Sequence, residues 1–249
     1  MIEITNLSKS FHSHQKVEVI FDGLSLTIPK GEFVTILGPN GCGKSTLFNL
    51  ITQIDTNYAG NITIEHSHNH RSEKIAYMLQ KDLLLPWLTV YQNIVLGLRI
   101  KGKVNSETET LIDNYLVKLK IDRFKYSYPS TLSGGQKQKV ALIRTLVLDT
   151  DILLLDEPFS AIDYNTRLEL QEEIFKYAEK QNTTVVLISH DIDEAITVSD
   201  RILIFSKAPT TILLDIPIKL SATNRNPVTA RQIPEFANYY NTIWENYPK

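Results

Sequence analysis

Short apolar stretches recur along the whole chain and predict strands. Over residues 1–36, apolar positions alternate with more polar ones, which is typical of short strands with one buried face. Nearly continuous apolar runs follow at 32–37 (EFVTIL), 151–155 (DILLL) and 184–189 (TVVLIS), as in a parallel sheet covered on both faces. Further strands are predicted at 61–65, 74–79, 201–206 and 210–216.

Helical spacing of apolar residues appears between these strands. It predicts helices at 44–54, about 164–180 and 232–246, and it runs through residues 82–147, which we expect to form a separate helical lobe. Strand and helix alternation with such an insertion predicts an α/β fold. We expect one domain over residues 1–249, with the lobe at about 82–147 and closing strands and a helix at about 201–249.

Composition narrows the class of protein. The chain has 249 residues and a formal net charge of −2, so no overall basic bias points to nucleic acid. Its single cysteine, Cys42, gives no disulfide framework. No apolar run approaches the roughly 18 residues of a membrane helix, and the first residues do not resemble a secretory signal. We therefore expect any membrane role to come through a partner.

A glycine-rich loop lies between a predicted strand and a predicted helix. Residues 38–46 read GPNGCGKST and match the phosphate-loop pattern G-x-x-x-x-G-K-[ST]. Glycines let backbone N–H groups crowd around phosphate oxygens, and the helix N-terminus favours negative charge. The predicted nucleotide-binding residues are Gly38, Pro39, Asn40, Gly41, Cys42, Gly43, Lys44, Ser45 and Thr46. Cys42 has two interpretations, a reactive thiol or a small side chain in the loop, and we favour the second.

Lys44 and Ser45 have specific expected roles in this loop, and an acidic pair completes the site. Lys44 is expected to reach the β- and γ-phosphates of ATP, and Ser45 to ligate Mg²⁺. Asp156 and Glu157 follow the apolar run 151–155, at the carboxyl edge of the predicted sheet where ligands bind. We expect Asp156 to hold Mg²⁺ and Glu157 to activate a water molecule.

A second anion site is predicted at residues 132–136 (LSGGQ). Ser133, Gly134, Gly135 and Gln136 stand at the start of a predicted helix, whose N-terminus favours an anion. One chain with one phosphate loop has no obvious need for two such sites. Two copies arranged head to tail would use both.

At this point the sequence resembles the ABC transporter ATPase family, over about residues 1–205. LSGGQ is the family's signature, and other family elements appear in order. Phe11 matches the aromatic residue that stacks on adenine, and Gln80 the glutamine between the active site and the permease contact. Asp163 belongs to the dimer-contact loop, and His190 matches the histidine that reaches the γ-phosphate. Small departures are lysines at 137 and 139, where arginines are common, and Ile162 in place of leucine.

The resemblance implies a fold and a reaction. The fold is a RecA-like P-loop NTPase core with an N-terminal antiparallel β subdomain and an inserted helical lobe. The implied catalytic residues are Glu157, His190, Gln80 and Lys44, with Ser45, Gln80 and Asp156 at Mg²⁺. Phe11, Ser133, Gly134, Gly135, Gln136 and Asp163 join the phosphate loop in binding ATP. Implied partners are a second copy, integral membrane permease subunits and, indirectly, an extracytoplasmic solute-binding protein, with the chain on the cytoplasmic face of the membrane.

The sequence after Gln80 indicates a particular branch of this family. Pro86-Trp87, followed by Leu88-Thr89-Val90, resembles importers of the nitrate, sulfonate and taurine type, including those for pyrimidine precursors of thiamine. Trp87 has two interpretations, a permease contact or a side chain packed inside the lobe. Lys219-Leu220 departs from the Pro-Arg pair typical of the branch. The alternatives are an exporter subunit or a soluble ABC ATPase outside transport.

A histidine cluster is the remaining candidate site. His66, His68 and His70 alternate within HSHNHR and could form a metal site. An exposed turn between two strands is the interpretation we favour.

Overall fold

The computed structural model describes residues 1–13, 16–65, 75–160, 162–221 and 227–248. The strands are β1 (Ile2–Ser13), β2 (Lys16–Ile28), β3 (Phe33–Leu37), β4 (Ala59–Ile64), β5 (Ile75–Met78), β6 (Ile152–Asp156), β7 (Thr184–Ile188), β8 (Arg201–Phe205) and β9 (Ile212–Pro217). The helices are α1 (Lys44–Ile51), α2 (Val90–Ile100), α3 (Ser106–Lys118), α4 (Gly134–Leu146), α5 (Tyr164–Gln181), α6 (Ile192–Val198), α7 (Pro227–Ala230) and α8 (Pro234–Asn246).

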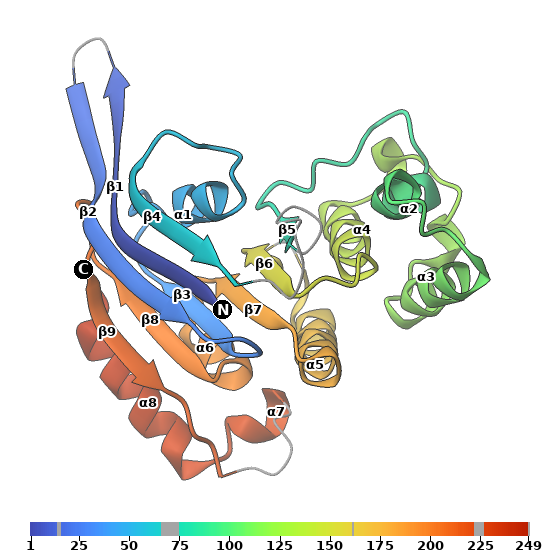
Figure 1. Cartoon of the computed structure of the whole chain (residues 1–249). Coiled ribbons are helices and arrows are strands. Elements are labelled where there is room, and N and C mark those ends of the chain that lie inside the picture. The colour runs from blue at the N-terminus through green and yellow to red at the C-terminus, as the bar shows by residue number, and fades with distance from the viewer. Residues whose placement is uncertain (14–15, 66–74, 161, 222–226, 249) are drawn as a thin grey trace.

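The central sheet has the strand order β5-β6-β7-β3-β8-β9. Its strands are parallel except β9, which pairs antiparallel with β8. Every residue of β3, β6 and β7 is buried, because helices or the second sheet cover both faces. The apolar runs predicted as covered parallel strands are therefore confirmed (Figure 1).

The second sheet is antiparallel, with the order β2-β1-β4. Its apolar face shares one core with the central sheet and with α1, which contributes Leu47, Phe48, Leu50 and Ile51. The Phe48 ring meets Tyr77 edge to face at a centroid distance of 5.6 Å. Burial of a side chain such as Phe48 stabilises the fold by about 2–3 kcal/mol. This packing fixes α1, and with it the loop that precedes α1.

Three details of the sequence-based prediction were wrong or incomplete. Residues 2–13 and 16–28 form two long strands rather than several short ones, because irregular register near Gly23 lets the strands continue through a polar stretch. Helix α1 ends at Ile51, since Gln53 adopts a left-handed φ of 61°, and Ile54 is 65% exposed rather than on the buried face. Helix α6 was missed; Asp191 caps it by accepting from the Glu194 N–H.

Helices α2, α3 and α4 form a lobe to one side of the sheets (Figure 1). Each begins with a capping box, at Thr89, Asn105 and Ser133 respectively. Helix α4 packs against both α2 and β5, so it joins the lobe to the central sheet. No helix in the described part of the chain has the length and apolar character needed to cross a bilayer.

Candidate functional site

The glycine-rich loop connects β3 to α1, as the sequence predicts. Lys44 is 7% exposed, and its ammonium group donates to the carbonyls of Gly38 at 2.7 Å and Pro39 at 2.9 Å. The side chain therefore lies in the curve of the loop. A buried ammonium group here gives the loop a positive centre that suits phosphate oxygens.

Glycine is required where α1 begins. Gly43 has a φ of 98°, and a Cβ there would lie 2.4 Å from Cγ2 of Ile20. As N-cap of α1, Gly43 offers no side-chain hydrogen bond, and the first turn contains no acidic residue. The positive end of the helix dipole is thus left for an external anion.

The structure favours the structural interpretation of Cys42. The side chain is 1% exposed, and burial raises the pKa of its thiol, against the opposing effect of Lys44. A thiol that stays protonated and covered is a poor nucleophile.

Asp156 ends β6 beside this loop. It is 3% exposed, and its carboxylate accepts a hydrogen bond from Ser45. Burial raises the pKa of Asp156, while the Ser45 bond and the charge of Lys44 lower it. A hydroxyl and a carboxylate held together are the hard oxygen donors that Mg²⁺ prefers, so the residues present fit that ion.

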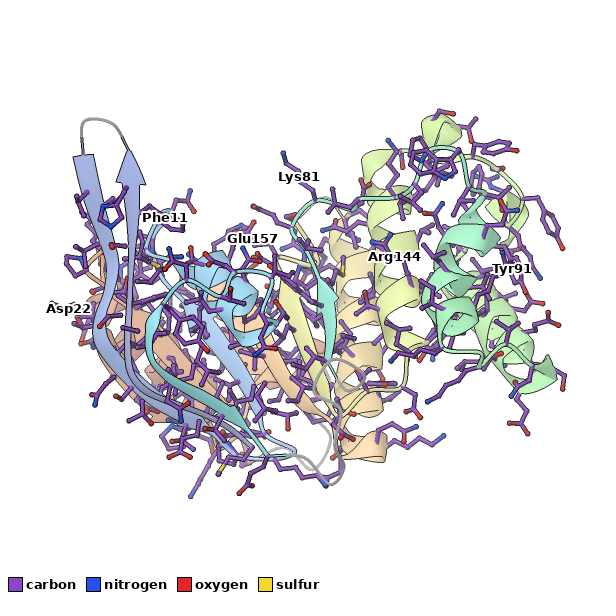
Figure 2. All side chains as sticks on the ribbon, turned by 45° about the horizontal axis from the view of Figure 1, so that its top comes forward. Phe11, Asp22, Lys81, Tyr91, Arg144 and Glu157 are labelled. Atoms are coloured by element: carbon purple, nitrogen blue, oxygen red, sulfur yellow. The ribbon has the colours of Figure 1, made fainter. Side chains whose placement is uncertain are left out.

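Glu157 is contacted by two other predicted site residues. Its carboxylate accepts from the Gln80 side-chain amide at 3.1 Å and lies 3.8 Å from Nδ1 of His190. Gln80 follows β5, Glu157 follows β6 and His190 follows β7, so three neighbouring strands deliver them to one edge of the sheet. Figure 2 shows Glu157 between Phe11 on one side and Lys81 and Arg144 on the other.

The backbone of Glu157 is held in an uncommon conformation. Its φ is 48°, in the left-handed region that non-glycine residues seldom occupy. Two bonds hold the backbone there: the N–H donates to the carbonyl of Ile188 at 3.0 Å, and its carbonyl accepts from the side chain of Gln138 at 3.0 Å. Strained residues of this kind cluster at functional sites.

Gln138 was missed as a site residue by sequence reasoning. It is 5% exposed on α4 and also donates to the hydroxyl of Ser160 at 3.3 Å. A polar residue on the apolar side of the predicted helix 137–147 is the signal that could have identified it, because buried amides need partners. Through Gln138, the helix that carries LSGGQ holds the backbone of Glu157.

The LSGGQ segment lies at the start of α4. Ser133 is the N-cap: its hydroxyl accepts from the Gln136 N–H at 3.3 Å, and the Gln136 side chain accepts from the Ser133 N–H at 2.9 Å. Ser133 and Gly134 are exposed, and a Cβ on Gly134 would meet nothing within 4 Å. The helix start therefore offers an open, glycine-lined surface, while the bonds of Ser133 and Gln136 described here are local to the turn.

The remaining predicted residues described by the structure are Phe11 and Asp163. Phe11 is on β1, 45% exposed, with the ammonium of Lys9 4.8 Å from its ring centroid. Asp163 is exposed and caps α5 by accepting from the Thr166 N–H at 3.1 Å. The histidine cluster at 66–70 lies outside the described residues, as does Ala161 in the segment before Asp163.

The comparisons with known proteins decide the family. A family model described as ABC transporter matches residues 21–160. The chain belongs to the ABC transporter family. Within it, the chain is an ATPase subunit, as its phosphate loop and its relatives agree.

Relatives and solved structures of this ABC family extend the match beyond residue 160. An uncharacterised ABC transporter ATP-binding protein, YtlC of Bacillus subtilis, is 36% identical over 98% of this chain and 94% of its own length. The aliphatic sulfonates import ATP-binding protein SsuB of Bacillus cereus is 39% identical over 88% of this chain and 86% of its own. A dimeric, post-hydrolysis structure of the ATP-binding cassette MJ0796, bound to ADP and Pi, matches with a TM-score of 0.76 at 27% identity, covering 88% of this chain and 99% of that one. The fold expected from the sequence and the resemblance to the sulfonate-type importer branch are confirmed.

Proposed function

We propose that this ATPase subunit pairs head to tail with a second copy on MgATP and drives solute import through a separate membrane permease. The observation that carries the proposal is the meeting of Gln80, Glu157 and His190 at the strand ends beside the phosphate loop. Two side chains that meet the carboxylate of a third, each following a different strand, form a site for chemistry rather than for packing.

The phosphate loop would bind the triphosphate. Backbone N–H groups of residues 40–43 and of the start of α1 would meet the phosphate oxygens, with Thr46 beside them, and Lys44 would neutralise negative charge. Phe11 offers an exposed ring on which adenine would stack. Ser45 and Asp156, with Gln80 nearby, would hold Mg²⁺, which supplies positive charge to the phosphate groups.

Glu157 would act as the general base. A water oxygen bonds to the γ-phosphorus, the bond from that phosphorus to the β–γ bridging oxygen breaks, and the water proton passes to the carboxylate. The products are ADP and inorganic phosphate. Gln80 and His190 orient the water and the γ-phosphate, because both already contact the Glu157 carboxylate.

The second nucleotide contact would come from the partner copy. The open helix start at Ser133, Gly134 and Gly135, with Gln136, suits a γ-phosphate presented from outside, and the exposed side chain of Asp163 would contact the partner. The structural neighbour MJ0796 is described as dimeric, which supports this pairing.

An exposed apolar surface after Gln80 would receive the permease. Leu83 is 53% exposed and Trp87 is 69% exposed, so the interpretation of Trp87 as packed inside the lobe is wrong. An exposed aromatic side chain such as Trp87 is typical of binding hot spots. We place the subunit peripherally on the cytoplasmic face of the membrane, with no nucleic-acid partner.

The solute class is proposed from the relatives. Proteins named for aliphatic sulfonate import match most of the chain, so we propose a solute of the sulfonate, nitrate, taurine or pyrimidine-precursor type, delivered by an extracytoplasmic binding protein. The test is uptake of labelled taurine, alkanesulfonates, nitrate and a hydroxymethyl-pyrimidine in the native host, with wild type or Glu157→Gln. Loss of uptake of one compound in the variant supports import and names the solute, whereas unchanged uptake of all four contradicts the branch assignment.

A further inference from the structure

Side chains from the last fifth of the chain hold the phosphate loop from outside. The Tyr247 hydroxyl donates to the carbonyl of Gly38 at 3.1 Å, and the Thr210 hydroxyl donates to the carbonyl of Cys42. Gly38 and Cys42 are the first and fifth residues of the loop. Both donors lie beyond residue 160, where the family match ends.

The position and the pKa of Tyr247 suit a permanent hydrogen-bond donor to the Gly38 carbonyl. It directly follows α8, and its ring packs in the core formed by Leu37, Ile243 and residues of α6 and β8. Burial raises the pKa of the phenol, and the nearby Cys42 and Glu157 raise it further, so the hydroxyl keeps its proton at neutral pH. The position of α8 thereby sets the position of one loop carbonyl.

The Gly38 carbonyl has a second donor, the ammonium group of Lys44 at 2.7 Å. Lys44 also donates to Pro39, and its nitrogen lies 3.9 Å from the sulfur of Cys42. An ammonium group has three protons. Each bond that Lys44 makes to a phosphate oxygen therefore takes a proton away from an acceptor in the loop.

We propose that Tyr247 is a positioning residue for the phosphate loop: its hydroxyl holds the Gly38 carbonyl while Lys44 turns to the nucleotide. Gly38 is buried, and an unpaired buried carbonyl is costly. Without the Tyr247 hydroxyl, a proton that Lys44 donates to the phosphates is no longer available to the Gly38 carbonyl. The inference rests on the proposed function, because it assigns Lys44 to the nucleotide.

The first test needs no nucleotide. We compare urea unfolding of wild type, Lys44→Met, Tyr247→Phe and the double variant. Among the described residues, either single variant leaves the Gly38 carbonyl one donor, whereas the double variant leaves it none. The double variant should therefore raise the unfolding constant by about ten-fold more than the product of the two single effects. Additive behaviour, equal to that of a Lys44→Met/Tyr239→Phe control, would overturn the shared-carbonyl geometry.

Tyr239→Phe is the matched control for Tyr247→Phe in both the unfolding and the binding experiments. Tyr239 is on α8, the helix that Tyr247 follows, and its hydroxyl accepts from the Lys219 N–H at 3.1 Å. Both substitutions remove one phenol hydroxyl from α8 or its end and keep the ring.

The second test measures equilibrium affinity for MgADP and MgATP by titration calorimetry, together with KM and kcat. Tyr247→Phe should weaken both affinities by about three- to ten-fold and raise KM while kcat changes less, because the bound loop loses its remaining donor. Tyr239→Phe should bind like wild type. Wild-type affinity in Tyr247→Phe would overturn the proposal.

The same titration separates this inference from the proposed function. If wild type binds MgATP, Lys44→Met does not and Tyr247→Phe binds normally, the phosphate-loop assignment stands and only the role of Tyr247 fails. If wild type and Lys44→Met bind equally, the proposed function fails, and the role of Tyr247 fails with it.

Discussion

Arg144 donates to the main-chain carbonyl of Asp82 at 2.7 Å and to that of Leu83 at 3.1 Å. Arg144 lies in the last turn of α4, the helix that begins at the LSGGQ segment, and Asp82 and Leu83 follow Gln80. Two charge-assisted bonds therefore tie the signature helix to the proposed permease surface. Because α4 also holds the Glu157 backbone through Gln138, one helix links that surface to the proposed catalytic carboxylate.

Replacing Arg144 should loosen this link. Arg144→Met keeps an unbranched apolar stem but removes both bonds, and we expect a loss of about 1.5–3 kcal/mol in the free energy of unfolding. Amide exchange at residues 81–85 should also accelerate, as measured by mass spectrometry. Arg144→Lys, which keeps the charge, should lose less. Unchanged exchange at 81–85 in Arg144→Met would show that the bonds do not hold this segment.

Glu194 is a buried carboxyl group on α6, the helix that follows His190 in the chain. It accepts from the side chain of Gln171 at 3.0 Å and from the hydroxyl of Ser189. Burial raises its pKa to about 7, and the charge of Asp191 adds to this, while the two hydrogen bonds and Arg167 oppose it. Its folded-state pKa thus lies above the unfolded value of 4.5.

A raised carboxyl pKa makes stability fall with rising pH. Between about pH 4.5 and 7 the folded state holds a proton on Glu194 that the unfolded chain releases, so this group's contribution is fully present below 4.5 and lost above 7. Over this window the loss is about 3 kcal/mol. The free energy of unfolding of Glu194→Gln, measured in urea, should therefore rise relative to that of wild type as the pH rises. The exposed Glu245→Gln serves as control, and parallel pH curves for wild type and Glu194→Gln would contradict the prediction.

A negative charge at the signature should block pairing of two copies. Ser133→Asp and Ser133→Asn both keep a good N-cap for α4, but only the first places a carboxylate where the partner's γ-phosphate would bind. In a Glu157→Gln background with ATP, analytical ultracentrifugation should detect dimers of the Ser133→Asn variant and monomers of the Ser133→Asp variant. Equal dimer fractions in the two variants would argue against the head-to-tail arrangement.

Much of the fold follows from local sequence pattern. The runs that became β3, β6 and β7 are short and almost entirely apolar because both of their faces are covered, so length and composition predict them directly. Helix α6 was not predicted. It has only seven residues, its first turn is acidic, and the buried Glu194 finds partners on other elements. Such contacts are set by tertiary structure.

Some residues of the candidate site can be predicted from local sequence, and others cannot. The residues of the phosphate loop, Glu157 and Ser133 stand in local patterns whose chemistry is readable from residue type and spacing. Gln138 and Tyr247 do not, because each acts on a backbone carbonyl far along the chain: Gln138 on Glu157 and Tyr247 on Gly38. No local periodicity encodes these pairs, and only the packing of α4 and α8 brings them together.

The most direct test of the central claim is the steady-state rate of MgATP hydrolysis by Glu157→Gln. Glutamine keeps the shape of Glu157 and a hydrogen bond to Gln80, but it cannot accept the water proton. We expect the rate to fall by about 100-fold or more, with ATP affinity unchanged in a parallel binding titration. Near-normal hydrolysis by the variant would contradict the assignment of Glu157 as the base.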